Sequence, residues 1–152
     1  MQTFAPLNHP AECAACLDLK RLGKQIIECR QIGKAIANPG YGWQNHPATK
    51  MWRGHEAGLL VYNTYMNAEW EERRDKTHGA YKNMLDDYGV TYEYAQRLAL
   101  RSDAIEELFP DWWGKWVVHR SHQSNLLRKD PEHYGEWFPG TPDDLDYVWP
   151  VR

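Results

Sequence analysis

The feature that most constrains this chain is the spacing of its apolar residues. Through the stretch LDLKRLGKQIIECRQI and just beyond it, apolar or small side chains recur every three or four positions, at Leu22, Ile26, Cys29, Gly33 and Ile36. This spacing places them on one face of a helix. No segment shows the alternation of a half-buried strand, and the chain has no internal repeats. The pattern therefore predicts an all-α fold, formed as a compact single domain over residues 1–152.

Glycine, proline and capping residues predict where the helices begin and end. We expect helices over residues 11–37, 48–74, 79–88, 92–109 and 117–130. The first should end at NPGYGW, the third at Gly89 and the last at Asp130-Pro131. Thr91 is expected to cap the fourth, which should break near Ser102. Residues 1–10 should be extended, and the irregular C-terminal segment should be held to the body by its aromatic side chains.

Composition narrows the classes of partner. The net charge is -3 and the pI is about 6.1, which argues against strong long-range attraction to nucleic acid. Short basic clusters on an acidic chain suit a small phosphate ligand at least as well as a long duplex. Three cysteines and no targeting or membrane-spanning segment predict a cytoplasmic protein. We expect no metal and no cofactor, because neither CAAC nor the histidine pair His119 and His122 has the further ligands that a metal site needs.

The first helix also carries a polar face. Arg21, Lys24 and Glu28 are three and four residues apart, so two cations and a carboxylate should lie together. Arginine and lysine are the residues that bind phosphate, and a carboxylate beside a sugar can move a proton or stabilise positive charge. The alternative is a solvated face in which Glu28 pairs only with Lys24.

Other candidates for phosphate or nucleotide binding lie further along the chain. Lys50 and Arg53 are expected near the start of the second helix, where a bound anion would offset their charge. The remaining candidates are His46, His55, His119, Arg120, His122, Arg128 and Lys129, and the stacking candidates are Trp43, Trp52 and Trp137. For each, the competing interpretation is structural: a hydrogen-bonded buried histidine, a cationic last turn, or core aromatic bulk.

Three segments together resemble the phage-type pyrimidine-dimer DNA glycosylases, also called endonuclease V. RLGKQIIE is similar to the active-site helix of that family, HPATKMWRGHEAGLLVY to its long central helix, and RKDPEHYGEWF to its aromatic C-terminal segment. The resemblance implies a compact all-α domain with an irregular aromatic C-terminal segment.

The resemblance also implies a chemistry. In the family, the N-terminal α-amine forms a Schiff base with the sugar and a helix glutamate assists, and Glu28 stands at the position of that glutamate. Residue 2 here is Gln2, whose bulk should leave Met1 in place, so the catalytic amine would belong to Met1. The family arginine that precedes the glutamate is replaced by Ile27.

Two functions remain open from the sequence. The first is a DNA-repair glycosylase, with or without lyase activity, that acts on a damaged or modified base with the help of Glu28. The second is a non-catalytic protein on the same scaffold that captures or sequesters a small signalling nucleotide in a basic, aromatic pocket. The partner is then either DNA or a small nucleotide, with no membrane. The sequence leaves the oligomeric state open, a homo-oligomer included.

Overall fold

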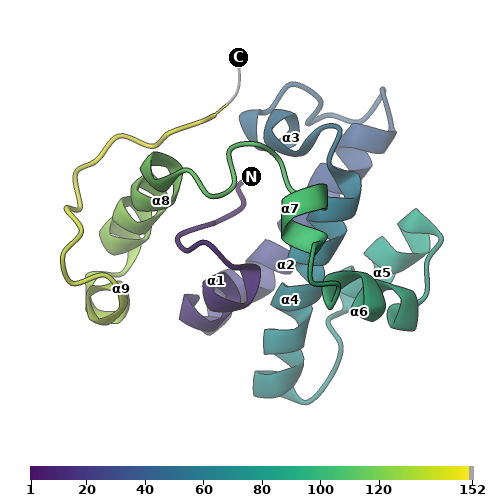
Figure 1. Cartoon of the computed structure of the whole chain (residues 1–152), viewed down its shortest axis with the longest axis horizontal. Helices are drawn as coiled ribbons and strands as arrows, with labels where there is room; N and C mark the ends of the chain where they lie inside the picture. The colour runs from purple at the N-terminus through teal and green to yellow at the C-terminus, as the bar shows by residue number, and fades with distance from the viewer. Residues whose placement is uncertain (151–152) are drawn as a thin grey trace.

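The computed structural model describes residues 1–150, and within them it contains only helices (Figure 1). In chain order these are α1 (Pro10–Cys16), α2 (Leu19–Ala37), α3 (Pro47–Trp52), α4 (Glu56–Arg74), α5 (Gly79–Tyr88), α6 (Tyr92–Ala99), α7 (Ala104–Leu108), α8 (Trp116–Lys129) and α9 (Pro131–Trp137). The predicted all-α class is confirmed. None of these helices is both long and apolar enough to cross a membrane. The last two residues of the predicted domain, 151–152, lie outside the described part of the chain.

The helix predicted over residues 11–37 is divided in two. Leu17 is extended (ψ 136°), and Asp18 then caps α2 by accepting a hydrogen bond from the backbone N–H of Arg21. The predicted core face of α2 is confirmed, since Leu22, Ile26 and Cys29 are fully buried. After this break, α2 packs its buried face against α4 and α5, and α1 packs separately against α4.

The helix predicted over residues 48–74 is also divided, and this error in the prediction changes where Lys50 and Arg53 lie. Gly54 has φ +87°, a conformation that suits glycine and interrupts the helix between α3 and α4. Lys50 therefore lies in the last turn of α3 and Arg53 caps its C-terminal end. A helix C-terminus favours cations, so no bound anion is needed to explain either of them there.

The other boundaries follow the sequence more closely. Thr91 caps α6, the break between α6 and α7 contains Ser102, and α5 ends at Gly89 with φ +65°. One helix was missed. Asp130 and Pro131 end α8, but Asp130 also accepts a hydrogen bond from the backbone of His133 and so starts α9. Proline at the first helical position suits a helix start as well as a helix end.

The N-terminal segment, residues 1–8, runs through the middle of the molecule between α8 and the helices α1, α2 and α4 (Figure 1). The backbone of Ala5 is bound on both sides by α8: its N–H donates to His122 Nδ1 at 2.8 Å, and its carbonyl lies 2.5 Å from His119 Nδ1. Gln123 Nε2 donates to the carbonyl of Pro6 at 2.8 Å. The extended N-terminus is thus a buried element of the core.

The C-terminal tail, residues 139–150, lies along α8 (Figure 1). Arg128 Nη1 donates to the backbone carbonyls of Asp143 and Leu145 at 2.7 and 3.0 Å. Further along, the ring of Tyr147 stacks on His122 with centroids 4.7 Å apart and an interplanar angle of 15°. The expectation that aromatic side chains hold the tail to the body is confirmed, and Arg128 adds polar contacts to it.

Candidate functional site

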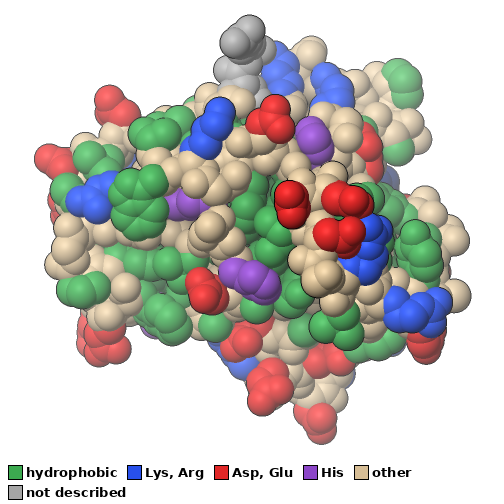
Figure 2. All heavy atoms as spheres, in the orientation of Figure 1, with side chains coloured by type: hydrophobic (Ala, Val, Ile, Leu, Met, Phe, Trp, Pro, Cys, Tyr) green, Lys and Arg blue, Asp and Glu red, His purple; other side chains and the backbone are tan. Residues whose placement is uncertain are grey.

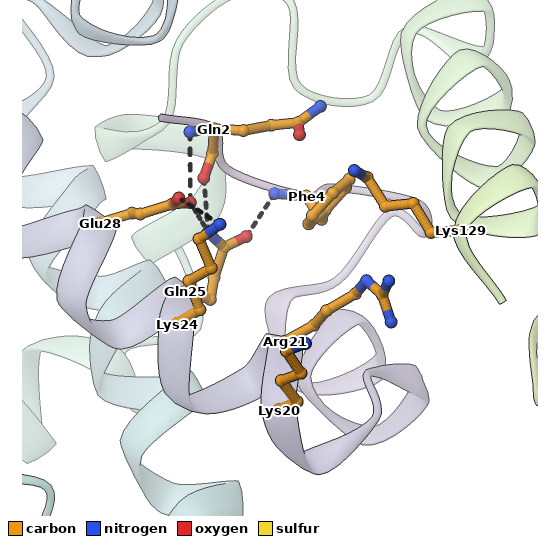
Figure 3. Close-up of a pocket in the computed structure, with 8 residues that line it drawn as sticks. All are labelled: Gln2, Phe4, Lys20, Arg21, Lys24, Gln25, Glu28 and Lys129. Carbon is orange, nitrogen blue, oxygen red and sulfur yellow. Dashed lines mark hydrogen bonds and ion pairs between the residues drawn. The ribbon is translucent and has the colours of Figure 1, made fainter.

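A pocket opens where the N-terminal segment crosses α2 (Figure 3). Two residues of the segment, five of α2 and the last residue of α8 line it: Gln2, Phe4, Lys20, Arg21, Lys24, Gln25, Glu28 and Lys129. The face predicted from helical spacing, Arg21 with Lys24 and Glu28, therefore does line a pocket. Lys129, predicted separately, reaches the same pocket from more than a hundred residues away in the sequence.

Glu28 is the only carboxylate among these lining residues, and its side chain points at the N-terminal segment. Its Oε2 accepts hydrogen bonds from the backbone N–H of Gln2 and from Gln25 Nε2, each at 3.2 Å, while Oε1 lies 3.9 Å from Lys24 Nζ. The residue is only 8% exposed. Burial raises the pKa of Glu28, and the charges of the N-terminal amine and Lys24 oppose this rise.

Four cations face that single carboxylate. Arg21 is tied to Asp18, whose Oδ1 lies 3.1 Å from its Nη1. Lys24 is 70% exposed, and its ion pair with Glu28 is long. Within residues 1–150, Lys20 and Lys129 form no ion pair. The pocket is therefore locally basic and suited to a phosphate group.

The face of the molecule drawn in Figure 2 is different in character. Over the face drawn in Figure 2, acidic and basic side chains are interspersed, in keeping with the net charge of -3. Contacts with an anionic ligand thus have to come from a local site rather than from a broad basic surface.

Two predicted residues lie close to the pocket without lining it. His46 caps α3 by accepting from the N–H of Ala48, and its pKa is lowered by burial and then by the nearby N-terminal amine. Trp43 packs edge-on against His46 with ring centroids 5.6 Å apart and remains 47% exposed. Trp149 of the tail also packs edge-on against His46, with ring centroids 5.9 Å apart. These rings form an aromatic group beside the N-terminus.

Several other predicted residues have structural partners instead. His119 and His122 are buried and hold Ala5, as described above. Trp52 is fully buried, and its Nε1 donates to Thr3 Oγ1 at 2.9 Å. Arg120 and Arg128 bind backbone carbonyls of the tail.

The remaining predicted residues lie outside the pocket. Arg53 donates to the carbonyl of Gln44, and Lys50 is exposed on α3. His55 stands before α4 without capping it, and Trp137 is exposed at the end of α9. None of these four residues lines the pocket, and their role in binding stays a prediction.

Sequence reasoning missed four lining residues and one that lies near two of the lining residues. Gln25 could have been found, since it is four residues from Arg21 and three from Glu28 on the same face. Lys20, Gln2 and Phe4 carried no comparable signal. Tyr147 of the tail lies near Gln2 and Glu28, and burial raises the pKa of its phenol. Its hydroxyl is buried and finds no hydrogen-bond partner among residues 1–150.

The fold and the pocket together define a class: a small all-helical protein with a buried glutamate beside its N-terminus and a ring of cations around it. A family model described as pyrimidine dimer DNA glycosylase matches residues 1–83, which is more than half of the 152-residue chain, and the chain belongs to this family. The match contains both α2 and the first two segments of the resemblance, whereas the third lies beyond it. No curated protein and no solved structure matches the chain.

Proposed function

We propose that this protein is a DNA glycosylase that acts on a pyrimidine dimer or a related damaged base, with Glu28 assisting cleavage of the glycosidic bond. The observation that carries the proposal is the hydrogen bond between the nitrogen of residue 2 and Glu28 Oε2, 3.2 Å long, at the base of a cationic pocket. Membership of the pyrimidine dimer DNA glycosylase family supports it.

The geometry supports two contributions from Glu28. As a carboxylate it stabilises the positive charge that develops on the sugar while the bond from C1′ to the base breaks and its electron pair leaves with the base. It also lies within reach of a proton on the nitrogen of residue 2 or on an attacking water. Lys20, Arg21 and Lys129 line the same pocket, and we expect them to hold the phosphates on either side of the damaged nucleotide.

A covalent step depends on which nitrogen ends the chain. With Met1 in place, the nitrogen of Gln2 is an amide and cannot attack a sugar, and the amine belongs to Met1. Removal of Met1 would convert that same nitrogen into a primary amine beside Glu28. Glycosidic bond cleavage assisted by Glu28 needs no such processing, whereas a Schiff base on residue 2 does.

The test is cleavage of the glycosidic bond, detected as an alkali-labile abasic site, in a duplex that contains one pyrimidine dimer, compared with the same undamaged duplex. Glu28→Gln should lower the rate by about 10²–10⁴-fold, while binding of the damaged duplex holds or strengthens, because the interaction lost is made mainly in the transition state. Glu12→Gln, the same change at an exposed site on α1, should match wild type. A wild-type protein that neither binds nor processes the damaged duplex would contradict the proposal.

One observation favours a second candidate, capture of a small nucleotide. The cations gather in a single pocket on an acidic chain, which suits a ligand with one or two phosphates. A small nucleotide should bind with a shallow dependence on salt, whereas a duplex that contacts several phosphates should show a steep one. Under this candidate, Glu28→Gln should change affinity by about 1 kcal/mol or less, and Lys24→Ala or Arg21→Ala by more.

A further inference from the structure

Gln25 makes more hydrogen bonds than any other side chain that lines the pocket. Its Oε1 accepts from the backbone N–H of Phe4 at 2.5 Å and from the Tyr62 hydroxyl at 3.0 Å. Its Nε2 donates to the carbonyl of Gln2 at 2.5 Å and to Glu28 Oε2 at 3.2 Å. Gln25 is 1% exposed, and its side chain extends from α2 to the N-terminal segment (Figure 3).

The partners of Gln25 fix the orientation of its amide. The N–H of Phe4 can only donate, so it needs the carbonyl oxygen of Gln25. The carbonyl of Gln2 and the carboxylate of Glu28 can only accept, so they need the NH₂ group. A reversed amide would set donor against donor at Phe4 and acceptor against acceptor at both other sites. Gln25 is therefore held in one orientation and bonds the Phe4 N–H, the Gln2 carbonyl and the Glu28 carboxylate at once.

We propose that Gln25 is the positioning residue of this site, which holds the nitrogen of residue 2 and the Glu28 carboxylate at bonding distance and donates a hydrogen bond that favours the carboxylate form of Glu28. It grips the N-terminal segment on both sides of residue 3, through the carbonyl of Gln2 and the N–H of Phe4, and it donates to Glu28 from the same amide. This inference rests on the proposed function for its catalytic meaning, but the geometry it asserts can be measured without DNA.

The charges around Glu28 define what the measurement must separate. The N-terminal amine on the segment, Lys24 on α2 and Lys129 on α8 favour the ionised form, and Tyr147 on the tail presents a neutral phenol. Gln25→Glu leaves all of these in place. It replaces the NH₂ donor by an oxygen at 3.2 Å from Glu28 Oε2, so two carboxyl groups would share one buried site.

The experiment is a carbon-13 NMR titration of the glutamate carboxyl groups in the full-length protein, with the Glu28 signal assigned by its loss in Glu28→Gln. We expect Gln25→Glu to raise the Glu28 pKa by about one pH unit or more, as like charges in a shared site do. Gln25→Met, which is neutral, should raise it less, and this variant serves if Gln25→Glu does not fold.

The matched control is Gln123→Glu. Gln123 is also a buried glutamine that binds the backbone of the N-terminal segment, at Pro6, but it does not touch Glu28. The Gln123→Glu variant should leave the Glu28 titration unchanged. In the glycosidic-cleavage assay, the acid limb of the pH–rate profile should move to higher pH in Gln25→Glu together with the NMR titration.

Each result bears on a separate statement. A Glu28 titration that is the same in wild type and in the folded Gln25 variants would overturn the positioning role, whatever the activity. A shifted titration in a protein that cleaves no glycosidic bond would support the positioning role and contradict the proposed function. A shift of equal size in Gln123→Glu would show a general effect of charge and would also overturn the assignment.

Discussion

Burial of His122 should make the fold sensitive to mild acid. The ring is fully buried between the N-terminal segment and the tail, and burial, with a smaller contribution from the neighbouring His119, lowers its pKa from 6.5 to about 3. In the unfolded chain the ring titrates normally. Between these values the unfolded state binds a proton that the folded state does not, so stability falls as the pH falls.

The size of the effect follows from the two pKa values. One pH unit corresponds to about 1.36 kcal/mol. Between pH 7 and pH 5 the unfolded ring takes up most of a proton and the folded ring almost none, so the free energy of unfolding should fall by about 2 kcal/mol. This is a large share of the roughly 5–15 kcal/mol that stabilises a typical domain.

The assay is urea unfolding at pH 7 and pH 5, followed by tryptophan fluorescence. His122→Asn is the comparison, because its side-chain oxygen can still accept the hydrogen bond from Ala5 and it does not titrate. The loss of stability between the two pH values should be about 2 kcal/mol smaller in the variant than in wild type. All other histidines are shared by both proteins, so equal losses would refute the reasoning.

Two further predictions concern the N-terminus and the cations. The intact mass of the protein should show that Met1 is retained, because Gln2 is bulky. Borohydride should then trap little covalent complex between the protein and damaged DNA. The Gln2→Ser variant should lose Met1 and give far more of this complex. Efficient trapping by wild type through its terminal amine would contradict this expectation. Binding of the damaged duplex should weaken steeply with salt, and Lys129→Ala should reduce the slope of log K against log[salt] by about one. An unchanged slope would remove Lys129 from the phosphate contacts.

Local patterns in the sequence predicted the parts of this molecule that are local. The three- and four-residue spacing gave both the buried face of α2 and the polar face with Arg21, Lys24 and Glu28. Thr91 and Gly89 marked helix ends because capping depends on a few neighbouring residues.

The remaining features depend on contacts that no local pattern encodes. That Lys129 joins the pocket depends on how α8 packs, and that His122 binds Ala5 depends on the path of the N-terminal segment. Lys50 and Arg53 were misplaced because a single glycine, Gly54, adopts a positive φ and divides the helix. The aromatic content predicted that the tail packs against the body, but it did not predict that Tyr147 lies near Gln2 and Glu28.

The path of the N-terminal segment has a consequence for how the protein matures on the ribosome. The N-terminal segment is synthesised before α8, whose residues bind it, and 117 positions separate Ala5 from His122. Until α8 has left the exit tunnel, the segment has no partner on that side and the pocket lacks Lys129. Contacts between distant parts of a chain form late and slowly. The protein should therefore acquire its site only after α8 has been synthesised, and a nascent chain that ends before α8 should not form it.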